Sequence, residues 1–287
     1  MACATAARHG TVGVMDAAVT LASLQKAGTE QNRKTYRRHG APDPLFGVSF
    51  ATLNKLAKQI KIDHDLATAL WASGNTDART LAAKIADPAR LDAATAARWI
   101  EDAKYAGVVD EVAGVVARSP LALTCMAEWV ASDDEWLGRA GWGIMRALAA
   151  DTAAVPDASF TPYIAVIERR IHDAKNKTRE AMNRALIAVG SRSAELAETA
   201  IAAARRIGPV EIDHGDTSCM TPDAELYIKK TRAYTREKSS KGAAAARKKV
   251  AGRAVVKAAP AKRSAKPAAK RATNGAAKKK KLATRRR

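Results

Sequence analysis

The sequence predicts an all-α fold, and two features lead to this prediction. Amphipathic stretches of roughly 10 to 16 residues follow one another from about Ser49 to Arg206, and no alternating strand pattern interrupts them. The composition agrees, because 47% of the residues are hydrophobic but only 5% are aromatic, and Ala is abundant. At 287 residues the chain is long enough for one large helical domain or two small ones.

The expected elements follow from the positions of the helix breakers. The stretch VMDAAVTLASLQKAG predicts a first helix that ends near Gly28, and RRHGAPDPLFGVS is typical of a loop. Later helices are separated by KIDH, SGNT, ADPARLD, RSP, SDDE, DTAAVPDASF, HDAKN and GSRS. Several of these breaks place Asp, Ser or Asn where the side chain can accept hydrogen bonds from the first turn of the next helix. RRIGPVEIDHGDTSCMTPD interrupts the helical pattern, and AELYIKKTRAYTREK predicts a last helix.

Weak internal similarity indicates a repeat architecture. LWASGNTDARTLAAKIA and EWVASDDEWLGRAGWGIMRALA share a Trp, an Ala-Ser turn and an Arg that opens an apolar helix. Arg139 and Arg179 are 40 residues apart, the spacing of HEAT-type helix pairs, although Arg79 and Arg139 are 60 apart. The sequence therefore predicts a HEAT-like or armadillo-like α-solenoid over residues 14–237, with a compact helical bundle as the alternative.

The net charge of +20 is concentrated at one end of the chain. Of the 49 Lys and Arg residues, 19 lie between Lys238 and Arg287, where there is no Asp or Glu, so the other 30 face 29 acidic residues. We expect residues 238–287, like the leader 1–13, to be disordered, because the tail has too little apolar surface to fold. A flexible polycation binds DNA or RNA by releasing counterions, although a solubility or address signal is the alternative. Its densest blocks are Lys278, Lys279, Lys280 and Lys281, and Arg285, Arg286 and Arg287.

The sequence gives no sign of a membrane segment, a cofactor or a metal site. The chain has three widely separated cysteines, no secretory signal pattern and no apolar run long enough to span a bilayer. DHGDTSC gathers possible metal ligands, but its spacing matches no familiar zinc or calcium pattern, and a loop that caps the solenoid explains it equally well. We therefore expect a cytoplasmic, monomeric protein without a cofactor or metal.

Three of the predicted helices place polar groups opposite an apolar stripe. When REAMNRALIAVG is drawn as a helix with about 100° per residue, Arg184 lies on the outward face, with Asn183 beside it. The same projection turns Arg139, Trp142 and Arg146 outward in WLGRAGWGIMRALA and turns Asp110 outward in GVVDEVAGVVAR. The stripes are Met182, Ala185, Leu186 and Val189; Leu137, Ala140, Gly141, Ile144 and Leu148; and Val108, Val109, Val112, Val115 and Val116.

These outward groups fit a groove that holds a nucleic-acid backbone. Guanidinium groups bind phosphates, and an aromatic plane packs on a base or sugar. Each residue also has a structural alternative: Asp110 can complement a helix dipole, Arg139 can pair with nearby acidic residues, and Trp142 can pack against another helix. The shared face favours the groove, with Arg139, Arg146, Arg179 and Arg184 as candidate phosphate contacts and Tyr105 and Trp142 as candidate aromatic contacts.

An ordered series of motifs resembles the DNA alkylation repair family, which includes the AlkD-type DNA glycosylases. The series starts at YRRHGAPDPLFGVSF, continues through VVDEVA, EWLGRAG and REAMNRALIAVGSRS, and ends at IGPVEIDHGDTSCMTPDAELYI. It covers roughly residues 36–229. The resemblance implies a HEAT-like solenoid that cradles double-stranded DNA, and excision of cationic N3- or N7-alkylated purines assisted by two tryptophans and an aspartate.

The resemblance places the catalytic aspartate on Asp110 and leaves the aromatic positions unfilled. The family pattern WWDxVD appears as YAGVVD, so Ala106 takes the place of one tryptophan, with Tyr105 before it. Arg184 takes the place of the other in EAMNRALIA. The implied function is DNA binding, with glycosylase activity as one option. The alternatives are a protein that binds DNA structure without catalysis, and a protein-binding scaffold whose tail anchors it to DNA.

Overall fold

The computed structural model describes residues 16–151, 153 and 155–257, with only the helical backbone for residues 242–257. The predicted leader 1–13 and the basic blocks Lys278–Lys281 and Arg285–Arg287 lie outside the described residues.

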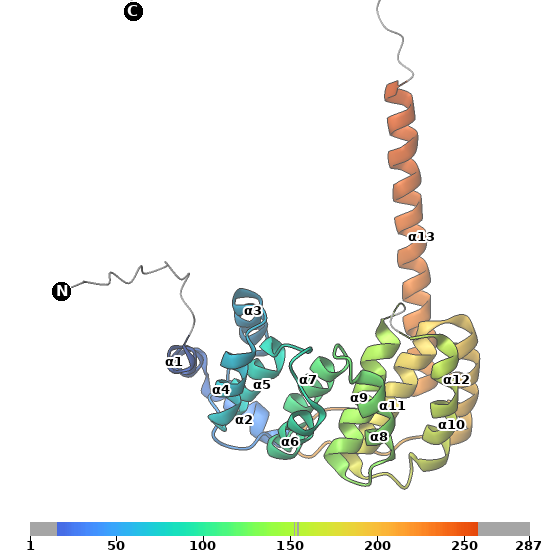
Figure 1. Cartoon of the computed structure of the whole chain (residues 1–287). Coiled ribbons are helices and arrows are strands. Elements are labelled where there is room, and N and C mark those ends of the chain that lie inside the picture. The colour runs from blue at the N-terminus through green and yellow to red at the C-terminus, as the bar shows by residue number, and fades with distance from the viewer. Residues whose placement is uncertain (1–15, 152, 154, 258–287) are drawn as a thin grey trace, which may run out of the picture. The chain divides into compact units, whose positions relative to one another are not determined.

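The described chain consists of helices, with one short 3-10 turn and no strand, which confirms the all-α prediction (Figure 1). The helices are α1 (Ala17–Ala27), α2 (Glu30–Arg38), α3 (Phe50–Ile60), α4 (His64–Ala72), α5 (Thr76–Ile85), α6 (Ala93–Ala103), α7 (Ala106–Val116), α8 (Ala122–Ala131), α9 (Glu135–Ala150), η1 (Asp157–Ser159), α10 (Thr161–Arg170), α11 (Asn176–Arg192), α12 (Ala194–Ile207) and α13 (Ala224–Lys257).

The helices stack as pairs in chain order. Helices α3, α5, α7, α9 and α11 form one row in which each contacts the next. A second set packs against this row: α4 contacts α5, α6 contacts α7, α8 contacts α9, and α12 contacts both α10 and α11. This arrangement is the predicted HEAT-like solenoid, and it puts the three helices with outward polar groups, α7, α9 and α11, side by side.

Side-chain caps set the helix starts that the sequence predicts. Asp63, Asn75, Asp134 and Ser193 each accept a hydrogen bond from the first turn of the helix that follows. The sequence analysis does not predict the break between α6 and α7, which occurs at Lys104 with a left-handed φ of 40°. A left-handed conformation is unusual for a residue with a Cβ, and glycine is the residue that commonly adopts it. Because no Gly or Pro stands at this position, the sequence carries no signal of the break.

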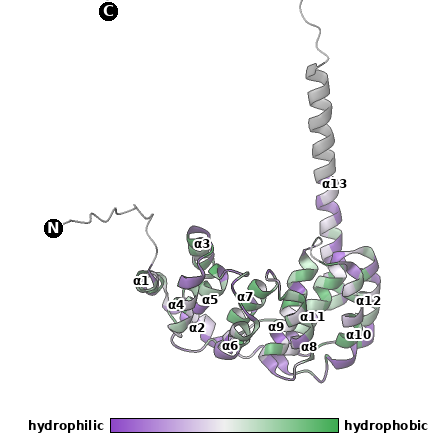
Figure 2. Cartoon of the chain, viewed as in Figure 1, coloured by the Kyte–Doolittle hydropathy of each residue, from purple (hydrophilic) through white to green (hydrophobic). Residues whose placement is uncertain are grey.

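Helix α9 is packed on several sides, which requires glycine. A Cβ on Gly141 would lie 2.6 Å from the backbone nitrogen of Val130 in α8, and a Cβ on Gly138 would lie 2.8 Å from Thr178 Oγ1 in α11. The predicted stripes of α7 and α11 are buried, and so is that of α9 except for the half-buried Leu137. Figure 2 shows hydrophobic residues in green and hydrophilic residues in purple, and both kinds occur in the stacked helices.

The chain divides into two compact units, residues 1–236 and 237–287. The sequence predicts that the last helix ends near Lys238, whereas α13 continues to Lys257. Ala, Lys and Arg are strong helix formers, and this propensity explains the longer helix. None of the helices in the described part of the chain combines the length and the apolar character that crossing a membrane requires.

Candidate nucleic-acid interface

A cleft of about 710 Å³ opens beside the N-terminal halves of α7, α9 and α11. Residues 208–223, which join α12 to α13 and which we call the strap, supply another wall. The end of α2 and the α6–α7 junction also reach the cleft. Basic, acidic and aromatic side chains therefore meet in one hollow.

A buried arginine forms the floor of the cleft. Arg139 of α9 donates to both carboxylate oxygens of Asp110 in α7, each at 2.9 Å, and to Glu180 of α11 at 2.7 Å. Its side chain is only 2% exposed. One guanidinium therefore joins three neighbouring helices, and the paired carboxylates make its burial tolerable.

A second arginine covers this network from the solvent side. Arg184 of α11 lies 2.6 Å from Glu180 and 3.6 Å from Asp110, and its side chain is 43% exposed. Two guanidinium groups and two carboxylates thus form a cluster with no net charge. The carboxylate of Asp110, the predicted catalytic group, is held between two cations.

The cluster shifts the pKa values of Glu180 and Arg139. Burial alone would raise the pKa of Glu180, but the charges of Arg139 and Arg184 outweigh it, and the pKa lies below its usual value. Burial would likewise lower the pKa of Arg139, and the charges and hydrogen bonds of Asp110 and Glu180 raise it instead. The ionised forms are therefore the stable ones.

One stripe of α11 fastens the strap beside the cleft. Asn176 exchanges two hydrogen bonds of 2.8 Å with the backbone of Asp213. Arg179 donates to the carbonyl of Glu211 at 2.9 Å, and Asn183 donates to that of Pro222 at 2.9 Å. Positions i, i+3 and i+7 share one helix face, so this stripe holds the strap in place along its length.

A family model for the DNA alkylation repair enzyme matches residues 20–227. The chain belongs to the DNA alkylation repair family. It is 28% identical to the uncharacterised protein Lin0241 of Listeria innocua over 218 residues, which are 73% of this chain and 94% of that protein. It is 27% identical to Lmo0209 of Listeria monocytogenes, over 74% of this chain and 96% of that one.

A solved structure is similar to this chain over most of its length. It covers 77% of this chain and 96% of its own, with 30% identity and a TM-score of 0.71. That protein belongs to a new family related to the HEAT-like repeat DNA glycosylases with affinity for branched DNA structures.

The positions that the DNA alkylation repair motifs indicate do meet in this cleft. Asp110, Tyr105, Ala106 and Arg184 all line it. Tyr105 is buried, and its ring lies so close to Gly107 that a Cβ there would be 2.7 Å away. Burial raises the pKa of Tyr105 to about 12, so the phenol stays neutral.

Two of the predicted groove contacts are placed elsewhere. Trp142 is only 1% exposed and packs edge-on against Tyr163 of α10, so its predicted outward orientation is wrong. The one-stripe projection fails here because α9 contacts α7, α8 and α11 at once. Arg146 is exposed but is not among the residues that line the cleft.

Three other polar residues named from the sequence have structural partners. Arg179 donates to three backbone carbonyls: that of Glu211 in the strap, and those of His172 and Ala174 between α10 and α11. Its guanidinium therefore holds backbone segments in place. Asn183, expected to face outward, is 1% exposed because the strap covers it. Arg139, predicted to point outward, is buried by the carboxylates of the adjacent helices.

The cleft also contains groups that the sequence analysis did not identify. Arg38, Lys104 and Lys177 line it, and none of them forms an ion pair with another described residue. Trp136 and Tyr227 add partly exposed aromatic rings. The signal for Arg38 was its place in YRRHGAP, but Lys104 and Lys177 could be found only once the helix ends were known.

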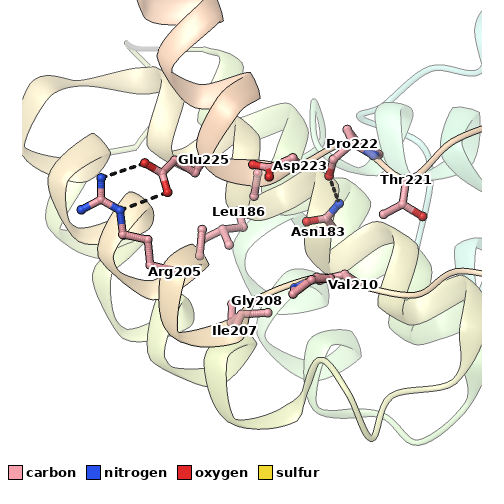
Figure 3. A pocket seen from close by; sticks show the side chains of 13 residues that line it. Asn183, Leu186, Arg205, Ile207, Gly208, Val210, Thr221, Pro222, Asp223 and Glu225 are labelled. Atoms are coloured by element: carbon pink, nitrogen blue, oxygen red, sulfur yellow. Dashed lines mark hydrogen bonds and ion pairs between the residues drawn. The ribbon is translucent and has the colours of Figure 1, made fainter.

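A second pocket, of about 420 Å³, shares Pro222 with the cleft (Figure 3). Leu186, Ile207 and Val210 supply apolar walls, and Arg205 pairs with Glu225 through bonds of 3.0 and 2.7 Å. Hydrogen bonds from Arg205 and Lys229 lower the pKa of Glu225 to about 2. The pair ties the start of α13 to α12, which anchors the C-terminal end of the strap.

Proposed function

We propose that this protein binds branched DNA in the cleft and does not excise cationic alkylated purines. The similar solved protein, 30% identical with a TM-score of 0.71, has affinity for branched DNA structures. The observation that carries the proposal is the charge pattern of the cleft: an electrically neutral floor and three cations without ion-pair partners at its edge.

The cations at the edge supply the attraction for the DNA backbone. Arg38 and Lys104 are exposed and Lys177 is half-buried, so their charges are available to phosphates. They come from three different elements, α2, the α6–α7 junction and α11. Because the three cations line one cleft, phosphates from more than one strand can approach them together, which is the arrangement at a DNA branch point.

The floor of the cleft argues against excision of a cationic base. A purine that carries a positive charge gains about 0.5 to 2 kcal/mol from an aromatic face, whereas Arg184 offers it another positive charge. The carboxylate of Asp110 is already paired with Arg139 and Arg184, so little of its negative charge is left to stabilise an oxocarbenium ion. The chain keeps the family aspartate in a place where it supports the fold.

The test compares a four-way junction with a linear duplex of equal length and with a duplex that contains one N7-methylguanine. We expect the full chain to bind the junction more tightly than the duplex and to form no abasic sites on the alkylated strand. Abasic sites that disappear in Asp110→Asn would instead establish a glycosylase. Equal affinity for junction and duplex would contradict branched-DNA recognition.

A matched pair of variants tests the cleft itself. Changing Arg38, Lys104 and Lys177 together to Gln should weaken junction binding and reduce the salt slope by roughly 2 to 3 units, about one for each lost phosphate contact. Changing Lys26, Lys55 and Arg169 to Gln removes the same charge from exposed positions outside the cleft. If both triple variants lose the same affinity, binding is a property of net charge and the cleft is not the site.

A further inference from the structure

An apolar side chain projects from the strap beside the cleft. Met220 is 87% exposed, more than any other large hydrophobic residue in the described part of the chain. It lines the cleft together with Tyr227, which is 49% exposed. Exposed apolar side chains of this size at a concave site indicate contact with a ligand.

The strap holds Met220 in this position from both sides. Before it, Thr217 Oγ1 donates to the carbonyl of His214 at 2.9 Å. After it, His214 Nε2 lies 3.1 Å from Thr221 Oγ1, and Pro222 accepts the bond from Asn183. These bonds order the backbone on both sides of Met220, so the loop loses little backbone entropy when a ligand covers the exposed side chain.

The surroundings of Met220 identify the chemistry of its ligand. The same cleft presents Arg38, Lys104 and Lys177, which attract phosphates, and the rings of Trp136 and Tyr227, which suit flat apolar groups. A flat apolar surface next to phosphates is what a base pair offers once its neighbour is no longer stacked on it. A continuous duplex hides such surfaces, whereas a branch point exposes them.

We propose that Met220 is a wedge that packs on the exposed base pair at the branch point and so selects branched DNA over linear duplex. Methionine is among the apolar side chains that proteins insert at unstacked base steps, and its sulfur makes favourable contacts with aromatic rings. This inference rests on the proposed function of the cleft. It assigns phosphate attraction to the cations and structure selection to the strap.

Substitution of Met220 tests the wedge without disturbing the fold, because the side chain is 87% exposed. Met220→Gln keeps the length of the side chain and removes its apolar character. We expect it to weaken binding of a four-way junction about tenfold, the effect of losing one stacking contact, and to leave linear-duplex affinity and the salt slope unchanged. Leu123→Gln is the control, because Leu123 is 53% exposed on α8 and does not line the cleft.

A fluorescent base reports the contact directly. With 2-aminopurine at the branch point, the unaltered chain should change the emission of the probe on binding, and Met220→Gln should not at saturating protein. A variant with normal junction preference and a normal 2-aminopurine response overturns the wedge and leaves branched-DNA binding intact. If the unaltered chain binds junction and duplex equally, both the wedge and the proposed function are overturned.

Discussion

Arg139 stabilises the fold as well as the cleft, because it joins α7, α9 and α11 from a buried position. Arg139→Ala leaves Asp110 and Glu180 with only the exposed Arg184 as a partner. We expect the free energy of unfolding to fall by about 3 to 5 kcal/mol, the effect of breaking a buried ion pair. Urea denaturation measures this change as a lower midpoint with an unchanged m-value.

Arg146→Ala is the control for that experiment, because Arg146 is exposed on the same helix and has no ion pair among the described residues. Its effect should stay within about 0.5 kcal/mol. Equal losses in the two variants would mean that the buried cluster contributes nothing specific to stability.

Glu180 makes part of the stability depend on pH. Its folded-state pKa lies below the ordinary value of a glutamate, because the charges of Arg139 and Arg184 outweigh the effect of burial. The folded state therefore binds fewer protons than the unfolded state, and stability is lost as the pH falls from about 4.5 through the folded-state pKa. We expect Glu180→Gln to lower stability at pH 7 and to flatten this acid decline in urea titrations from pH 3 to 6. Glu128→Gln, at an exposed position, should leave the decline unchanged; an identical decline in Glu180→Gln would refute the assignment.

For individual residues, the sequence predicts which side chains lie near one another but not the direction in which each side chain points. The motif order predicts that Asp110, Tyr105 and Arg184 belong to one site, and all three line the cleft. Trp142 is misplaced because a helical projection assumes one buried face, and α9 is covered on several. Only tertiary structure shows that Trp136, in the first turn of the same helix, is the aromatic residue of α9 that lines the cleft.

Close helix packing in the solenoid depends on glycines whose roles differ from helix to helix. In Gly141→Ala the new Cβ would lie 2.6 Å from Val130 N and 2.7 Å from the carbonyl carbon of Trp129, both backbone atoms. Helices α8 and α9 must then move apart, and we expect a loss of about 1 to 3 kcal/mol despite the better helix propensity of Ala. Thermal or urea unfolding measures the loss.

Gly114→Ala on α7 should instead increase the free energy of unfolding. Its Cβ would have only the Arg118 guanidinium nearby, at 3.8 Å. Without a steric conflict, Ala should stabilise the helix by about 0.5 to 1 kcal/mol. If both substitutions destabilise the protein equally, the close approach of α8 and α9 does not explain the glycine.

At the element scale, most helix starts were predictable because their caps are local. Asp63 and Asn75 accept bonds from residues at most three positions away, and such motifs are visible in the sequence. The break at Lys104 was not predictable, because the residue that adopts the left-handed conformation is a lysine and no Gly or Pro stands at the α6–α7 junction. The length of α13 was underestimated for a different reason, because low apolar content argues against burial but not against helix formation.

For the molecule as a whole, the cleft and most of the net positive charge lie in different parts of the chain. The cleft lies within residues 1–236, whereas 19 of the 49 basic residues follow Glu237. A polycation binds any DNA through counterion release, and the strength of that binding falls steeply with salt. We therefore expect the tail to add affinity for any DNA and the cleft to supply the preference for a branch point.

Removal of residues 238–287 should therefore separate affinity from selectivity. We expect the shortened chain to bind both four-way junction and linear duplex more weakly, by roughly 10- to 100-fold at 0.1 M salt, with a shallower dependence on salt concentration. The ratio of the two affinities should stay within about twofold of that of the full chain. Fluorescence anisotropy across a salt series measures all three quantities. A shortened chain that lost all DNA binding would identify the helical body as a protein-binding scaffold, whereas one that bound but lost its junction preference would assign the selectivity to the tail.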